Sequence, residues 1–437
     1  MAQITNHIEN FKMNINEDFV RKAQELEPAL HYKTVRPAQL VSFQPSDAPD
    51  KPNGWDLPVH NRADRVFDWI PCCMQPVEAL DTMPLSKGSS VCLDFGTHHV
   101  GYISFRLTPA GSPPDAPAHI RIKLGEMPCE IMEDTASYQG SISSSWIQEE
   151  YLHIDELPAR ISLPRRYAFR YLELKVMDTS PKYQVLLSDV SCDTVTSGDM
   201  SQVEPLNENV PEDLKRIDAI ALKTMEDCMQ SVFEDGPKRD RRLWIGDLRL
   251  QALTNYETFK NYDLVKRCLY LFAGLFLRPA PMVDDTSLFD YGLFFISCLH
   301  DYYQATGDRE TLMQLWPAAY HQAELALKRL DGRGVVKDSG DWWCFLDWND
   351  SLNKQAGAQG VLIYTLRQAL SLARLMCSET SGAESVKQLE SWIETAVRGA
   401  LEYLWDKELR FFISGQNRQV SWASQIWLVL AGVLDQE

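Results

Sequence analysis

The sequence lacks the features of membrane proteins and nucleic-acid-binding proteins. It has no apolar run long enough to span a bilayer, and residues 1–20 lack the basic start and apolar core of a signal peptide. The chain carries 43 lysines and arginines against 61 acidic residues, a net charge of −18. An acidic surface of this kind repels phosphate groups, which excludes nucleic acid and an anionic membrane as partners.

Metal-binding and cofactor-binding motifs are also missing. The ten cysteines are scattered without metal-ligand spacing, which is typical of free thiols in a reducing compartment and predicts a cytoplasmic protein. His98 and His99 lie in a strand-like segment, where neighbouring side chains point to opposite faces and do not share an ion. The sequence has no dinucleotide fingerprint, P-loop or calcium loop. We therefore predict neither a metal nor a cofactor.

The length of 437 residues is too great for one ordinary core, so two domains are expected. Residues 1–205 are predicted to form a β-sandwich domain, because short alternating runs are separated by Pro, Gly, Ser and Asp turns. Residues 1–30 are expected to be helical and to pack on the outside of this sandwich. The clearest strands are expected at 90–96, 100–107, 118–124, 168–176 and 183–188.

Residues 206–437 are predicted to form a helical domain, because the hydrophobic period changes to 3.6. The polar segment 199–211 is the candidate linker, and Pro211 suits the first turn of a helix. A block of strands followed by a block of helices indicates separate layers and not a parallel α/β sheet. Helices are expected near 212–230, 246–259, 262–276, 288–305, 309–330, 356–377, 384–404 and 421–434.

The most informative segment is 235–247, Asp-Gly-Pro-Lys-Arg-Asp-Arg-Arg-Leu-Trp-Ile-Gly-Asp, here called the acid turn. Its Gly-Pro pair cannot continue a helix, so the chain must turn there. Its carboxylates, Asp235, Asp240 and Asp247, can converge on one polar ligand. A sugar is the natural candidate, because its hydroxyls need acceptors and cleavage of its glycosidic bond needs a carboxylic acid. The alternative is a solvated turn whose acids pair with Arg239, Arg241 and Arg242.

Two further polar clusters lie between predicted helices. The first, at 279–291, contains Asp284, Asp285, Asp290 and Tyr291. The second, at 340–350, is called the aromatic loop, because it has three tryptophans and three aspartates. An aromatic plate beside acceptors suits a pyranose, and helices arranged in a ring would bring these loops to one end. The alternative is that the tryptophans only fill gaps between helices.

The acid turn resembles the catalytic signature of α-L-rhamnosidases of glycoside hydrolase family 78. Weaker matches occur in the same order as in the family, and the resemblance covers roughly residues 85 to 435. These matches are Leu93-Asp94-Phe95-Gly96, Val100-Gly101-Tyr102, Arg165-Arg166-Tyr167-Ala168-Phe169-Arg170-Tyr171-Leu172, Asp301-Tyr302-Tyr303, Thr306-Gly307-Asp308 and Gly340-Asp341-Trp342.

The resemblance implies an N-terminal β-sandwich, a catalytic (α/α)6 barrel and inverting hydrolysis of terminal α-L-rhamnose from small glycosides. By position, Asp240 corresponds to the general acid, where many members have Glu. Asp235 and Asp247 match positions that bind the sugar. The remaining candidates for substrate binding are Arg239, Trp244, Asp341, Trp343, Asp347 and Trp348.

An (α/α)6 barrel has twelve helices, and the pattern predicts about eight. No residue matches the family's catalytic base, a Glu far toward the C-terminal part of the barrel, so we expect an incomplete barrel whose base lies beyond residue 437. Asp341 or Asp347 could substitute for it. The last helix is strongly apolar, and an uncovered apolar patch predicts a homodimer or aggregation.

Other functions remain open at this point. One is another (α/α)6 glycosidase that acts on glucosides or uronic acids. A second is a non-catalytic sugar-binding or regulatory protein derived from such an enzyme, and a third is an interaction module without affinity for sugar.

Overall fold

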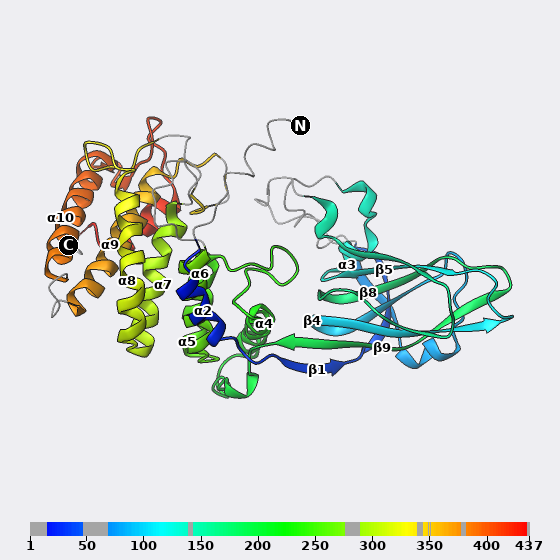
Figure 1. Cartoon of the computed structure of the whole chain (residues 1–437). Helices are drawn as coiled ribbons and strands as arrows, with labels where there is room; N and C mark the ends of the chain where they lie inside the picture. The colour runs from blue at the N-terminus through cyan, green and yellow to red at the C-terminus, as the bar shows by residue number, and fades with distance from the viewer. Residues whose placement is uncertain are drawn as a thin grey trace, which may run out of the picture.

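The computed structural model describes residues 15–46, 69–138, 143–275, 289–338, 344–347, 349, 351–376 and 382–434. The chain forms a strand-rich half and a helical half that lie side by side (Figure 1). The predicted order, strands first and helices second, is confirmed. None of the helices in these ranges is long and apolar enough to cross a membrane.

The first half is an antiparallel sheet of nine strands. The long strand β4 connects its parts, because it pairs with β2, β7, β8 and β9. The pairing of β4 with β8 shifts register between Asp94 and His99, around Gly96 at φ 82°, so that the predicted strands 90–96 and 100–107 form one bulged strand. The strands are β1 (His31–Val35), β2 (Gln39–Pro45), β3 (Trp69–Gln75), β4 (Ser90–Gly111), β5 (Ala118–Gly125), β6 (Gln148–Ile154), β7 (Ala159–Ser162), β8 (Tyr167–Asp178) and β9 (Tyr183–Thr196).

The core of this half is made by the apolar members of the alternating runs. Phe105, Tyr167 and Phe169 are almost completely buried there, at 1% exposure or less. Side chains along a strand point alternately to the two faces, so each run supplies one apolar face to the β-sandwich core. Burying an aromatic or aliphatic side chain of this size contributes roughly 1.5–3 kcal/mol.

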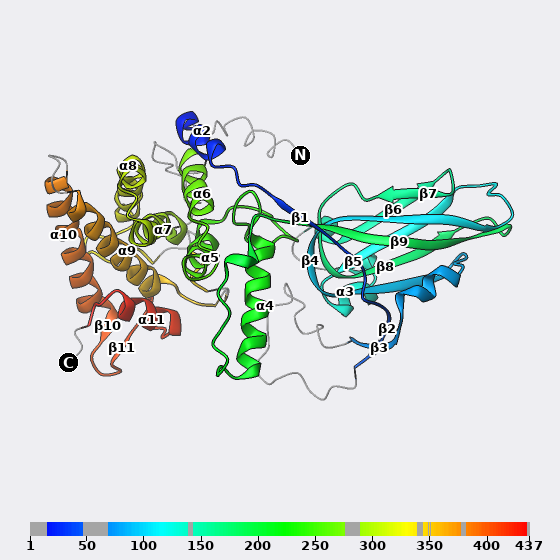
Figure 2. The same cartoon turned by 90° about the horizontal axis from the view of Figure 1, so that it is seen from below.

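The second half contains the eight predicted helices, with most ends within three residues of the expected positions. Helices α5, α7, α9 and α11 pack in a row, and α6, α8 and α10 flank that row as the other members of helical hairpins (Figure 2). The helices are α4 (Glu212–Cys228), α5 (Ile245–Glu257), α6 (Tyr262–Leu275), α7 (Phe289–Thr306), α8 (Arg309–Leu327), α9 (Gln355–Leu375), α10 (Gly382–Gly399) and α11 (Trp422–Leu430).

Helix α11 is apolar on more than one face. Leu428 is buried in the helical half, whereas Trp422 is 83% and Val429 is 64% exposed. The predicted apolar surface near the end of the chain is therefore present within the part that the structure describes.

The N-terminal helix α2 (Glu17–Glu25) corrects one expectation. It packs against α6 in the helical half and not on the outside of the sheet (Figures 1 and 2). The backbone N–H of Asn16 donates to the carbonyl of Gly274 at 2.9 Å, and the Arg267 side chain donates to the carbonyl of Ala23. Sequence periodicity reveals that α2 has an apolar face but not which surface that face covers.

Candidate active site

The acid turn connects α4 to α5, and its fold depends on local backbone bonds. The N–H of Asp235 donates to the carbonyl of Arg242, and the N–H of Arg242 donates back to Oδ1 of Asp235, each at 3.0 Å. Between them, Asp240 and Arg241 have φ values of 61° and 53°. Two consecutive non-glycine residues in this left-handed region store backbone strain, which often occurs at functional sites.

The Asp240 carboxylate is held from two sides by its own turn. Oδ2 accepts a hydrogen bond from Nε1 of Trp244 at 3.2 Å, and Oδ1 lies 3.1 Å from the Arg239 guanidinium. The side chain remains about a third exposed, at 34%. A carboxyl group that is oriented by neighbours and still open to solvent can reach a bound ligand.

The other two carboxylates are more enclosed and lie close enough to influence each other. Burial raises the pKa of Asp235 more than its bonds to the N–H groups of Arg242 and Gly236 lower it, and the negative charge of Asp240 raises it further. Burial also raises the pKa of Asp247, and the charges of Asp235 and Asp240 add to this. The charge of Asp240 therefore acts on Asp235, and the charges of both act on Asp247.

Tyr291, near the start of α7, connects the acid turn to the rest of the helical half. Its hydroxyl donates to Oδ2 of Asp247 at 3.3 Å. Its ring lies edge-on to Trp244, with ring centroids 5.9 Å apart, and contacts Phe345 at 5.1 Å. Acids, a tyrosine hydroxyl and aromatic faces are thus gathered beside one another, which is the set of groups that a sugar ring requires.

Gly246 allows this close approach. A Cβ atom at this position would lie 2.7 Å from the Tyr291 ring. We expect Gly246→Ala to destabilise the protein by about 1–3 kcal/mol, because the added methyl overpacks the site, and to weaken substrate binding by displacing Tyr291 from Asp247. Urea denaturation measures the loss of stability, and KM measures the weaker substrate binding. Gly332→Ala is the matched control, since nothing lies within 4 Å of its Cβ position; equal effects of the two changes would contradict this explanation.

The acid turn is not merely a set of surface ion pairs. Arg239 does pair with Asp240, but the Arg241 side chain donates to the carbonyl of Arg166, and Arg242 binds Asp235 only through its backbone. Among the described residues, the side chains of Arg241 and Arg242 therefore do not form the ion pairs that a solvated, salt-bridged turn would require.

The other predicted candidates have separate outcomes. Asp347 is exposed on the aromatic loop, close in sequence to Phe345, which contacts Tyr291. Asp290 is buried, and its Oδ2 accepts the N–H of Phe345 at 2.8 Å, so it holds that loop against α7. Five candidates lie outside the described residues: Asp284, Asp285, Asp341, Trp343 and Trp348.

Comparison with protein families explains this arrangement. Residues 58–194 match the glycosyl hydrolase family 78 α-rhamnosidase N-terminal domain, and residues 209–411 match the bacterial α-L-rhamnosidase six-hairpin glycosidase domain. A rhamnosidase from Klebsiella oxytoca, solved with rhamnose bound, is 45% identical, with a TM-score of 0.86 over 97% of this chain and 80% of that chain. The chain belongs to glycoside hydrolase family 78.

The family 78 chain is therefore an α-L-rhamnosidase-like glycoside hydrolase with a β-domain and a six-hairpin domain. A family 78 rhamnosidase of a Bacillus species shares the fold, with 22% identity and a TM-score of 0.66 over 83% of this chain and 39% of that chain. Comparison with curated protein sequences gave no match.

Sequence reasoning missed several contacts of the acid turn in this family 78 chain. Arg166 contacts the acid turn, and Lys238 belongs to it. Each has a partner that is distant in sequence: Arg166 binds Glu234, and Lys238 binds Glu130. Tyr291 was noticed only as part of a polar cluster. The one available signal was the stretch Arg165-Arg166-Tyr167, which matched the family without indicating what it touches.

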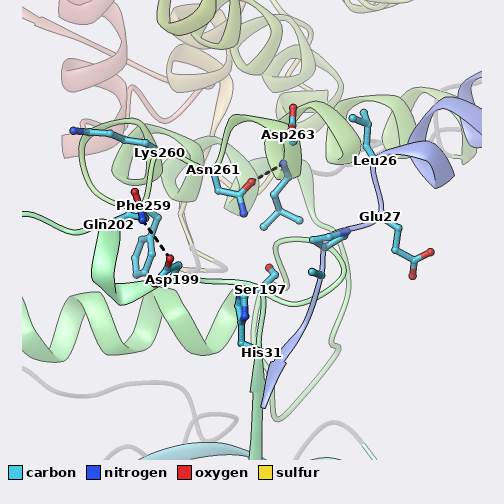
Figure 3. Close-up of a pocket in the computed structure, with 13 residues that line it drawn as sticks. Leu26, Glu27, His31, Ser197, Asp199, Gln202, Phe259, Lys260, Asn261 and Asp263 are labelled. Carbon is cyan, nitrogen blue, oxygen red and sulfur yellow. Dashed lines mark hydrogen bonds between the residues drawn. The ribbon is translucent and has the colours of Figure 1, made fainter. Parts of the chain in front are cut away.

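A separate pocket of about 490 Å³ lies where the chain passes between the two halves (Figure 3). Its lining includes Glu27, His31, Asp199 and Lys260. None of its lining residues belongs to the acid turn. Across the described ranges, no group of three or more His, Cys, Asp or Glu residues is arranged to hold a metal ion.

Proposed function

We propose that this protein hydrolyses terminal α-L-rhamnose from small glycosides with inversion at the anomeric carbon. In this reaction Asp240 protonates the departing glycosidic oxygen, while a second carboxylate on the opposite face of the ring activates water. The observation that carries the proposal is the hydrogen bonding of Asp240 to Trp244 and of Asp247 to Tyr291, whose two rings pack edge to face. The rhamnose bound to the Klebsiella relative supports the choice of sugar.

The other groups of the site have distinct roles in this proposal. Asp247 and Asp235 accept hydrogen bonds from sugar hydroxyls, and the Trp244 and Tyr291 rings offer apolar surface to the CH-rich face of the ring. Arg239 orients the Asp240 carboxyl through its contact at 3.1 Å. Asp290 holds Phe345 of the aromatic loop against α7, beside the Tyr291 ring.

The test is a panel of nitrophenyl glycosides with NMR detection of the first product. We expect release from the α-L-rhamnoside at least 100-fold faster than from the α-glucoside or the glucuronide, and β-rhamnose as the first anomer. Turnover of a different sugar, or an α-anomer first, would contradict the proposal. Binding of rhamnose in calorimetry without any turnover would favour the sugar-binding alternative.

A further inference from the structure

Arg166 belongs to the β-domain but contacts Arg241 of the acid turn and Glu234, the residue just before that turn. It immediately precedes β8, and its side chain is only 15% exposed. One nitrogen donates to both carboxylate oxygens of Glu234, at 2.7 and 2.6 Å, and the other donates to Oε1 of Gln230 at 2.7 Å. Its backbone carbonyl accepts the Arg241 guanidinium at 2.8 Å. One residue thus binds the chain just before Asp235 and just after Asp240.

The partner residues show why this contact matters for the geometry of the site. Glu234 directly precedes Asp235, and its carbonyl accepts Nε2 of Gln251 on α5 at 2.7 Å. Arg241 directly follows Asp240, and both have left-handed backbone conformations. Conformations of this kind cost about 1–3 kcal/mol each and persist only where surrounding contacts hold them. The bond from the Arg241 guanidinium to the carbonyl of Arg166 is one such contact, and the bond of the Arg166 side chain to Glu234 holds the chain at the start of the turn.

Removal of the guanidinium would leave the buried charge of Glu234 without its hydrogen-bonded ion-pair partner. Burial raises the pKa of Glu234, and Arg166 opposes that effect. Without Arg166, Glu234 would have to take up a proton or move toward water, and either change alters the chain beside Asp235. An uncompensated buried charge is strongly destabilising where it stays in place.

We propose that Arg166 is a positioning residue for the acid step, through which the β-domain holds Asp240 against the departing oxygen. This inference rests on the proposed role of Asp240 as the general acid. The lysine side chain of Lys238, bound to Glu130 in the β-domain, gives a second attachment two residues before Asp240. The β-domain is then part of the catalytic unit.

The test uses two rhamnosides that differ in how much they need an acid. A phenyl leaving group requires protonation, whereas 2,4-dinitrophenolate departs without it. We expect Arg166→Met to lower kcat about 100-fold for phenyl α-L-rhamnoside and less than about 10-fold for the dinitrophenyl compound. Arg166→Lys keeps the positive charge but cannot bind Glu234 and Gln230 at the same time, as the planar guanidinium does. It should fold normally and show the same preference with a smaller loss.

The matched control is Arg165→Met. Arg165 precedes Arg166, but its side chain binds Glu150 within the β-domain at 2.7 Å, so kcat should stay within about twofold of wild type for both substrates. Asp240→Asn is measured in parallel. If Asp240→Asn lowers kcat much more for the phenyl than for the dinitrophenyl compound, and the Arg166 variants lower kcat equally for both, the inference is overturned and the proposed function stands. If Asp240→Asn does not discriminate, the assignment of the acid fails, and this inference fails with it.

Discussion

Replacing Asp240 by Asn is expected to lower kcat/KM for an unactivated α-L-rhamnoside about 10³-fold, because general acid catalysis contributes roughly 10²–10⁴-fold. The amide has the shape of the carboxyl group and still accepts the hydrogen bond from Trp244, but it cannot give up a proton. Asn also tolerates the left-handed backbone at φ 61° better than most residues. The loss should therefore come from chemistry and not from misfolding.

Steady-state kinetics with phenyl and alkyl rhamnosides measures this effect. Asp213→Asn provides the matched control, because Asp213 is an exposed acid in the first turn of α4, and its loss should leave kcat/KM within about twofold. Rhamnose binding by Asp240→Asn should stay close to that of wild type. An Asp240→Asn variant that keeps a third or more of the wild-type activity would rule out Asp240 as the acid.

Raising the pH from 6.5 to 9.5 is expected to weaken the junction between the two halves by about 3 kcal/mol, through His98. His98 on β4 binds Asp227 of α4 through Nδ1 at 2.7 Å and Glu126 through Nε2 at 2.9 Å. Burial lowers the pKa of His98, but the hydrogen bonds to Asp227 and Glu126 outweigh it and raise that pKa to about 9.

The direction of this stability change follows from the pKa of His98 in the unfolded and in the folded chain. Its pKa is about 6.5 in the unfolded chain and about 9 in the folded one. Its contribution to stability is therefore complete below pH 6.5 and disappears as the pH rises through 9. Lys223 and Lys238 bind the same carboxylates as His98. The pKa of His98 lies within this pH range, so the charge of His98 changes there.

Urea denaturation of wild type and His98→Asn between pH 6 and 9.5 tests this prediction. The difference in unfolding free energy should shrink by about 3 kcal/mol over that range. His99→Asn is the neighbouring control. Burial and the charge of Lys223 lower the pKa of His99 to about 4, so its effect should not change above pH 6.5. A difference for His98→Asn that does not vary with pH would show that His98 is not charged in the folded protein.

Local sequence patterns were sufficient for the helices and for the acid turn. Helices such as α9 and α10 follow from the 3.6-residue spacing of apolar side chains, which each segment carries within itself. The reversal at Gly236-Pro237 follows from backbone chemistry, and with it the proximity of Asp235, Asp240 and Asp247. The family signature then identified the family to which the chain belongs.

Contacts between distant segments could not be predicted in this way. The pairing of Arg166 with Glu234 joins residues 68 positions apart, and that of Tyr291 with Asp247 spans 44. Nothing near either residue specifies its partner. The same holds for α2, which had a visible apolar face but was assigned to the wrong half of the protein.

The amino-acid order alone was enough to establish two domains, the helices and strands within them, and a turn rich in carboxylates, because these depend on neighbours a few residues apart. Tertiary packing decided which surfaces meet: the place of α2 beside α6, the contact of Tyr291 with Asp247, and the bond between Arg241 of the acid turn and Arg166 of the β-domain. Such choices depend on the summed burial and hydrogen bonding of whole elements, which no single stretch of chain contains.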